Sequence, residues 1–135
     1  MNSAEEIARR AKDQRQKGDS LAAEASYIEA AELARSVGSR EMRAHALRHV
    51  AELAAERGDG ERALQSAEEA LSLYQANPDE LPLNIANAHR VRALAFSALG
   101  REQDSARDWR AARDLYEELG IVAGVAECDR RLNSA

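Results

Sequence analysis

The sequence predicts an all-helical fold built from antiparallel helix pairs, and two features of its composition support this. Ala, Glu, Lys, Leu and Arg make up 78 of the 135 residues, which exceeds the roughly 50% typical of long-helix proteins. Strand-forming residues are scarce, since the chain has no threonine, nine Val and Ile residues together, and 4% aromatics. We therefore exclude β-sandwiches, barrels and parallel-sheet nucleotide folds, and expect one domain over residues 1–135.

Glycines divide the chain at regular intervals. Gly18, Gly58 and Gly100 lie 40 and 42 residues apart, each between two helical-looking segments. A glycine can adopt the left-handed conformation that ends a helix, and Asp19 or Asp59 can cap the helix that follows. Small residues recur at fixed steps from these glycines, as expected where helices approach closely: Ala11, Ala51, Ala93, Ala23, Ala63, Ser105, Ala30, Ala70 and Ala112.

A second set of breaks splits each unit into two helices. These breaks are Gly38, Gly120 and the proline-containing segment 77–82, because proline disfavours a helix at the residue before it. In chain order, we expect helices near residues 3–17, 20–37, 39–57, 60–76, 83–99, 102–119 and 121–133. The first six form repeat 1 (about 3–37), repeat 2 (about 39–76) and repeat 3 (about 83–119), and the helix at about 121–133 caps the array.

This pattern resembles the tetratricopeptide repeat family. The resemblance covers nearly the whole chain and rests on the glycine–acid turn, the small residues around it, and Tyr27 and Trp109 at matched places. The period is longer than the family's usual 34 residues and is similar to the long-repeat branch typified by kinesin light chains and bacterial regulators. The resemblance implies a right-handed α-solenoid of three helix pairs with a C-terminal capping helix. It also implies that a peptide or partner helix binds on the concave side, which the first helix of each pair lines.

Two residues of the fifth helix depart from the family pattern. His89 and Arg92 lie one turn apart near the expected packing face. Their side chains reach the edge of the helix, or the helix is rotated so that Val91 points inward. Because charged residues are rarely buried without partners, we expect a carboxylate near Arg92.

The sequence predicts no catalytic residue, no cofactor and no metal site, and so no enzyme. It lacks a phosphate-binding glycine loop. His45 and His49 have the four-residue spacing of helical metal ligands, but Arg48 between them disfavours a cation. Cys128 is expected to be a small packing residue. A small-ligand sensor or enzyme that uses His45, His49 or His89 stays open as a lesser alternative.

The partner-binding groove is expected to be modestly basic, although the whole chain has a net charge of −5. Two interpretations remain open. In one, an acidic segment or a C-terminal carboxylate binds through the groove cations. In the other, these charges are solvated and keep the helices soluble. The residues predicted to line the groove are Lys12, Arg15, His45, Arg48, Glu52, Asn87, Arg90 and Leu94.

We therefore predict a protein–protein interaction module. The net negative charge argues against nucleic acid as a partner, and no apolar run is long enough to span a membrane. The N-terminus lacks the apolar segment of a signal peptide, and a single cysteine suits a reducing compartment, so we expect a cytoplasmic protein. The Arg-rich, Lys-poor composition indicates a bacterial gene. The alternative is a structural unit that self-associates through its ends, for example as a homodimer through Ile121, Val122 and Val125 of the C-terminal helix.

Overall fold

The computed structural model of the protein describes residues 3–134, which form seven α-helices and no strand. Each helix end lies within one residue of the position predicted from the sequence. The helices are α1 (Ala4–Gln16), α2 (Ser20–Ser36), α3 (Arg40–Glu56), α4 (Gly60–Gln75), α5 (Pro82–Ala98), α6 (Glu102–Leu119) and α7 (Val122–Asn133).

Local interactions set the helix ends as the sequence predicts. The side chain of Asp19 accepts a hydrogen bond from the backbone N–H of Ala22 at 3.2 Å, and Asp59 accepts one from Arg62 at 3.1 Å. Each satisfies a backbone donor that has no partner within its own helix. The preceding glycines, Gly18 and Gly58, have φ angles of +84° and +85°, which residues with a Cβ atom rarely adopt. The predicted glycine–acid turn is confirmed.

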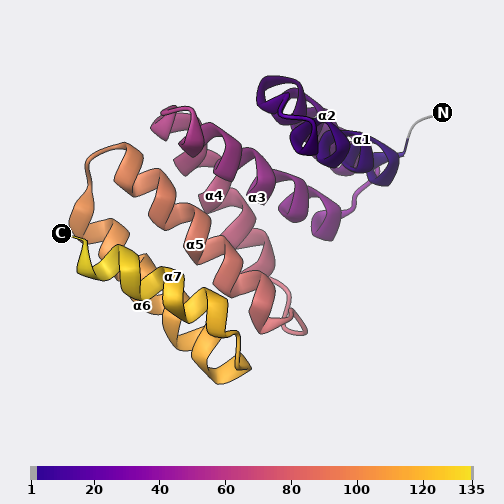
Figure 1. Cartoon of the computed structure of the whole chain (residues 1–135). Helices are drawn as coiled ribbons and strands as arrows, with labels where there is room; N and C mark the ends of the chain where they lie inside the picture. The colour runs from indigo at the N-terminus through magenta and orange to yellow at the C-terminus, as the bar shows by residue number, and fades with distance from the viewer. Residues whose placement is uncertain (1–2, 135) are drawn as a thin grey trace.

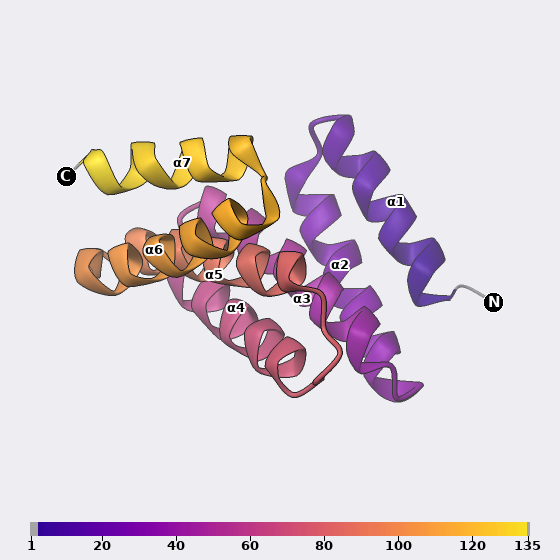
Figure 2. The same ribbon diagram turned by 90° about the horizontal axis from the view of Figure 1, so that it is seen from below.

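The helices stack into a solenoid. Each helix packs against the next along the chain, and α3 also contacts α1 and α5. Figure 1 shows the stack running from α1 to α7. In Figure 2, α1 and α7 rise on the same side of α3 and α5. The first helices of the pairs thus line a concave side that α7 closes at one end, and the predicted fold class is confirmed.

Small residues allow the close approach of the helices. Ala11, Ala51 and Ala93 occupy matched places in the three repeats and are fully buried. The larger side chains of Tyr27 and Trp109 are also buried at matched places and fill the space beside them. Small buried residues therefore recur in each pair, and a large side chain stands beside them in repeats 1 and 3.

His89 and Arg92, which depart from the family pattern on the fifth helix, share a buried carboxylate as their partner. Val91 points inward and is buried, while Arg92 reaches Asp108 of α6 through two hydrogen bonds of 2.8 and 2.9 Å. His89 Nδ1 lies 2.8 Å from the same carboxylate, whose side chain is only 4% exposed. Burial alone would raise the pKa of Asp108, but the hydrogen bonds from His89 and Arg92 hold it below its ordinary value. The carboxylate predicted near Arg92 is confirmed.

We expect Gly124→Ala to destabilise the protein by about 1–2 kcal/mol, because a Cβ atom there would lie 2.6 Å from Cγ of Tyr116. In an exposed helix the same change would stabilise by up to about 1 kcal/mol. Urea unfolding measures the difference. The control is Ala123→Gly at the exposed neighbouring position, which reports helix propensity alone. A Gly124→Ala variant more stable than the wild type would contradict the close contact between α7 and Tyr116.

Candidate functional site

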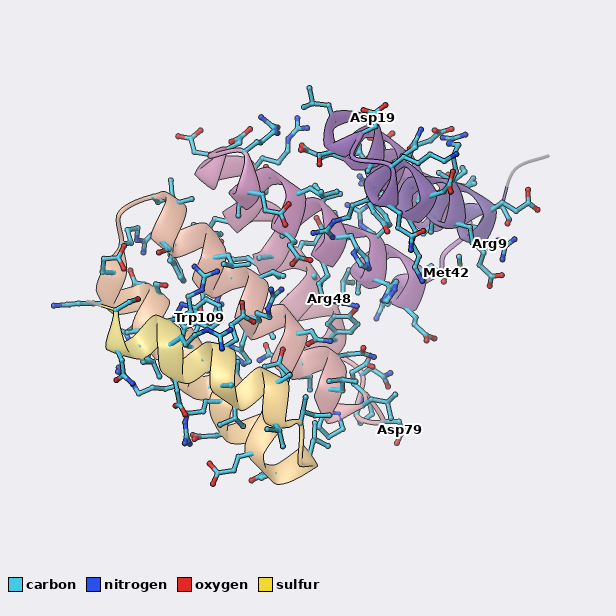
Figure 3. All side chains as sticks on the ribbon, viewed as in Figure 1. Arg9, Asp19, Met42, Arg48, Asp79 and Trp109 are labelled. Atoms are coloured by element: carbon cyan, nitrogen blue, oxygen red, sulfur yellow. The ribbon has the colours of Figure 1, made fainter. Side chains whose placement is uncertain are left out.

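The concave side is hollowed along the seam between α1 and α3. One cleft of 380 Å³ is lined mainly by small and apolar side chains, among them Ala8, Met42 and Tyr74. A second cleft of 410 Å³ continues along the same seam. Ala8, Arg9 and His45 line both clefts, so the two adjoin. Figure 3 shows Arg9 of α1 near Met42 of α3 at this seam. We call the two together the α1–α3 cleft.

The second half of this cleft is basic. Its lining includes Arg9, Lys12 and Arg15 and contains no carboxylate. Arg15 is neutralised by Glu52 and Glu56. Arg9 and Lys12 are exposed and form no ion pair with any residue between 3 and 134. The second half of the cleft therefore presents two positive charges that form no ion pair within the described chain, while the first half carries two exposed carboxylates, Glu5 and Glu41, that form none either.

A chain of ion pairs crosses the concave side from α1 to α7. Arg15 lies 3.2 Å from Glu52 of α3, which lies 2.8 Å from Arg90 of α5. Arg90 in turn lies 2.6 Å from Glu127 of α7. Burial would raise the pKa of Glu52, but Arg90 and Arg15 hold it below its ordinary value. We call this row, Arg15–Glu52–Arg90–Glu127, the ion-pair ladder.

Helix α7 occupies the C-terminal part of the concave side. Leu94 of α5 packs into the hydrophobic cluster that contains Cys128 and Val125 of α7. Asn87 accepts a hydrogen bond of 2.5 Å from the hydroxyl of Tyr116. The predicted groove residues of α5 are therefore engaged within the chain: Asn87 and Leu94 in packing, and Arg90 in the ladder.

Arg48 lies near the middle of the concave side (Figure 3). Its Nη2 atom donates to Nδ1 of His45 at 3.2 Å, and its buried Nε atom has no hydrogen-bond partner among residues 3–134. The hydroxyl of Tyr74 is likewise buried; burial raises its pKa, and the neighbouring guanidinium of Arg48 opposes that rise. Arg48 therefore borders the α1–α3 cleft through His45 and Tyr74, which both line it.

The two histidines of α3 are held in their neutral form. Burial and the positive charge of Arg48 lower the pKa of His45, and the same two causes, burial first, lower that of His49 to about 3. The His49 ring stacks on Tyr27, with the ring centres 4.6 Å apart. Within residues 3–134, no three His, Cys, Asp or Glu side chains gather as metal ligands would. Of the two histidines, only His45 is exposed to solvent on the cleft wall.

Comparison with known proteins places the fold. No protein-family model matches the sequence, and no curated protein matches it. Among solved structures, the chain is similar to BtubC (BKLC) from P. vanneervenii, a kinesin light chain-like helical protein, with a TM-score of 0.76 and 19% sequence identity. The fold is a helical repeat. The match covers 87% of this chain and 48% of BtubC, so the chain spans about half the length of that structure.

The structure brings some of the predicted groove residues to the α1–α3 cleft and places others in the ion-pair ladder or in the packing of α7. Of the predicted groove residues, Lys12, Arg15 and His45 line the α1–α3 cleft, Arg48 borders it, and Glu52 and Arg90 form the ladder. Arg9, Met42 and Tyr74 were missed. Tyr74 lies on the second helix of its pair and reaches the concave side between two first helices, which the repeat spacing does not reveal.

Each helix of the described range is too short or too polar to cross a bilayer.

Proposed function

We propose that the protein is a non-catalytic interaction module of the tetratricopeptide type that binds a segment of a partner protein in the α1–α3 cleft. The helical repeat fold supports this proposal, because stacked helix pairs present an extended concave surface suited to binding a chain. The glycine–acid turns and the matched Tyr27 and Trp109 support the assignment to this repeat type.

One observation carries the proposal: the α1–α3 cleft combines an apolar hollow with charged side chains that form no ion pair within residues 3–134. Met42 and Tyr74 provide apolar surface. Beside it, Arg9 and Lys12 and the carboxylates of Glu5 and Glu41 are exposed and form no ion pair within residues 3–134. Elsewhere on the concave side, the ladder and α7 satisfy the polar groups internally. A partner segment would bury apolar surface here and find polar groups that are still free to pair.

Filling the cleft tests the proposal. Ala8 lines both halves of the cleft, so Ala8→Trp should block it. The wild-type chain is used to select binders from a phage-displayed library of random peptides, and the affinity of each is then measured by fluorescence anisotropy. We expect Ala8→Trp to weaken binding at least tenfold and the matched change Ala25→Trp, at an exposed position of α2, to leave it unchanged. Circular dichroism confirms that both variants are folded.

Selected peptides that bind Ala8→Trp as tightly as the wild type would place the binding surface elsewhere. A wild-type chain that selects no peptide would count against peptide binding altogether.

Self-association is a second candidate, favoured by exposed apolar residues at the turns along one edge. Figures 1 and 2 show the α2–α3, α4–α5 and α6–α7 turns on the same edge of the stack. Val125 packs into the core, but Val122 is 80% exposed. Light scattering across a concentration series tests this: the mass of a monomer stays constant, whereas a dimer formed here should dissociate in Val122→Asp. The exposed large apolar residues of this edge are Val37, Leu81, Leu83, Leu119, Ile121 and Val122.

A further inference from the structure

The charged side chains that line the α1–α3 cleft are sorted along its length. Glu5 of α1 and Glu41 of α3 stand on the two walls of the first half. Lys12 lies in the second half only, and Arg9 lies where the two halves meet. All four side chains are exposed, and none forms an ion pair within residues 3–134. A segment that lies along the cleft therefore meets negative charge at one end and positive charge at the other.

The remaining titratable groups at the cleft do not change this order. Arg15, in the second half, is paired with Glu52 and Glu56. His45 lines both halves, but burial and the positive charge of Arg48 lower its pKa, so its ring is neutral at pH 7 and adds no charge. The first half thus carries two carboxylates against one guanidinium, and the unpaired charge of the second half is positive.

Two of the arginines from which a basic groove was predicted do not line this cleft. Arg90 is held by Glu52 and Glu127. Arg48 borders the cleft only through His45, to which it donates a hydrogen bond. The charge of a partner segment is therefore set by the side chains that line the cleft, and these include carboxylates that the sequence did not indicate.

We propose that the partner segment carries a Lys or Arg side chain that binds between Glu5 and Glu41, and no basic residue at the level of Lys12. This proposal rests on the proposed function of the α1–α3 cleft. A cation in the first half would gain two carboxylate partners, whereas a cation beside Arg9 and Lys12 would be repelled. The aliphatic stem of the Lys or Arg would pack on the apolar lining of this half, which includes Met42.

The distance between the two ends of the cleft sets the pattern expected in the partner. Glu5 and Lys12 are seven residues apart on α1, which corresponds to about 10 Å along the helix axis. An extended segment spans that length in about three residues. We therefore expect peptides that bind the cleft to be enriched in Lys or Arg at one position and depleted in both about three residues away, on one side only. The side of the depletion gives the direction in which the segment lies.

Selection and a double-mutant cycle test the pattern and the contact. Peptides are selected from a phage-displayed random library with the wild-type chain. The affinity of each peptide, and of its Lys→Gln or Arg→Gln variants, is measured by fluorescence anisotropy against the wild type and the double variant Glu5→Gln/Glu41→Gln. Because each exposed ion pair contributes modestly, we expect the double variant to bind about tenfold more weakly. One basic position should matter with the wild type and stop mattering with the double variant.

The chain offers a matched control in Glu61→Gln. Glu61 is the second residue of α4, just as Glu5 and Glu41 are the second residues of α1 and α3. It is exposed and lines neither half of the cleft. All three changes remove a negative charge from a first helical turn, so they weaken the same favourable interaction with the helix dipole. Glu61→Gln should leave the affinity unchanged, and circular dichroism confirms that every variant is folded.

The outcomes separate this inference from the function on which it rests. Peptides that Ala8→Trp blocks but that bind Glu5→Gln/Glu41→Gln as tightly as the wild type would keep the cleft as the binding site and overturn the role of the two carboxylates. Additive losses from the double variant and the basic position would also overturn it. Peptides enriched in Asp or Glu instead of Lys or Arg would overturn it too. A wild-type chain that selects nothing would overturn both proposals.

Discussion

Replacing Asp108 with alanine should lower the free energy of unfolding by about 3 kcal/mol, because it leaves a half-buried arginine and a histidine without their shared carboxylate. The Arg92 side chain is 27% exposed, which places the expected loss at the low end of the range for broken buried pairs. Urea unfolding followed by circular dichroism measures it. The control is Asp104→Ala on the same helix, whose partners Arg101 and Arg107 are exposed. We expect that change to cost less than about 1 kcal/mol. Equal losses from the two variants would show that the Asp108 cluster contributes no more than a surface pair.

The contribution of Asp108 should also depend on pH. Its pKa in the folded protein lies below the ordinary value of 3.8. The stabilisation is therefore fully present above about pH 5 and is lost as the pH falls through the folded pKa. The difference in stability between the wild type and Asp108→Ala should be constant near neutral pH and should narrow below about pH 4. A difference that persists unchanged at pH 2 would assign the loss to packing rather than to charge.

The largest single loss is expected for Trp109→Ala, at about 4 kcal/mol. Trp109 is buried in a cluster formed by α5, α6 and α7, together with Ala93, Tyr116 and Cys128. Its removal opens a cavity under α7, so the helix that carries Glu127 loses its support. Urea unfolding gives the magnitude, and hydrogen exchange of the α7 amides should show this helix opening before the rest. Trp109→Phe, which keeps most of the volume, should cost well under half as much. Unchanged protection of α7 in Trp109→Ala would contradict the role given to this cluster.

The fold was predictable from the sequence because the local signals that end, begin and pack helices recur with the period of the repeat. Gly18 and Gly58 end helices, Asp19 and Asp59 begin the next ones, and the alanines that mark close approach recur in step. Each of these signals acts over a few residues, so it can be read without knowing the neighbouring helices. The resemblance to tetratricopeptide repeats then supplied the order in which the pairs stack.

The site was predicted less well because charge pairing depends on side chains from distant helices. Arg90 pairs with Glu127, 37 residues away, only because α7 lies over α5. Arg15 and Arg90 were predicted to face a partner, yet the chain neutralises both. Glu24 resembles any helical glutamate in the sequence but is buried between Arg57 and Arg62. That Arg48 has no carboxylate follows only once these other pairs are known.

The ion-pair ladder has a mechanical consequence. A helical array can change its curvature, because each helix pair contacts only its neighbours and small rotations between pairs add along the stack. The ladder braces the four helices of the inner side with alternating charges, so any flattening of the array must pull apart Glu52 from Arg15 or Arg90, or Arg90 from Glu127. We therefore expect the curvature to soften in concentrated salt, which weakens the attraction between partly exposed charges. The width of the concave side is thus set by the chain itself before any partner arrives.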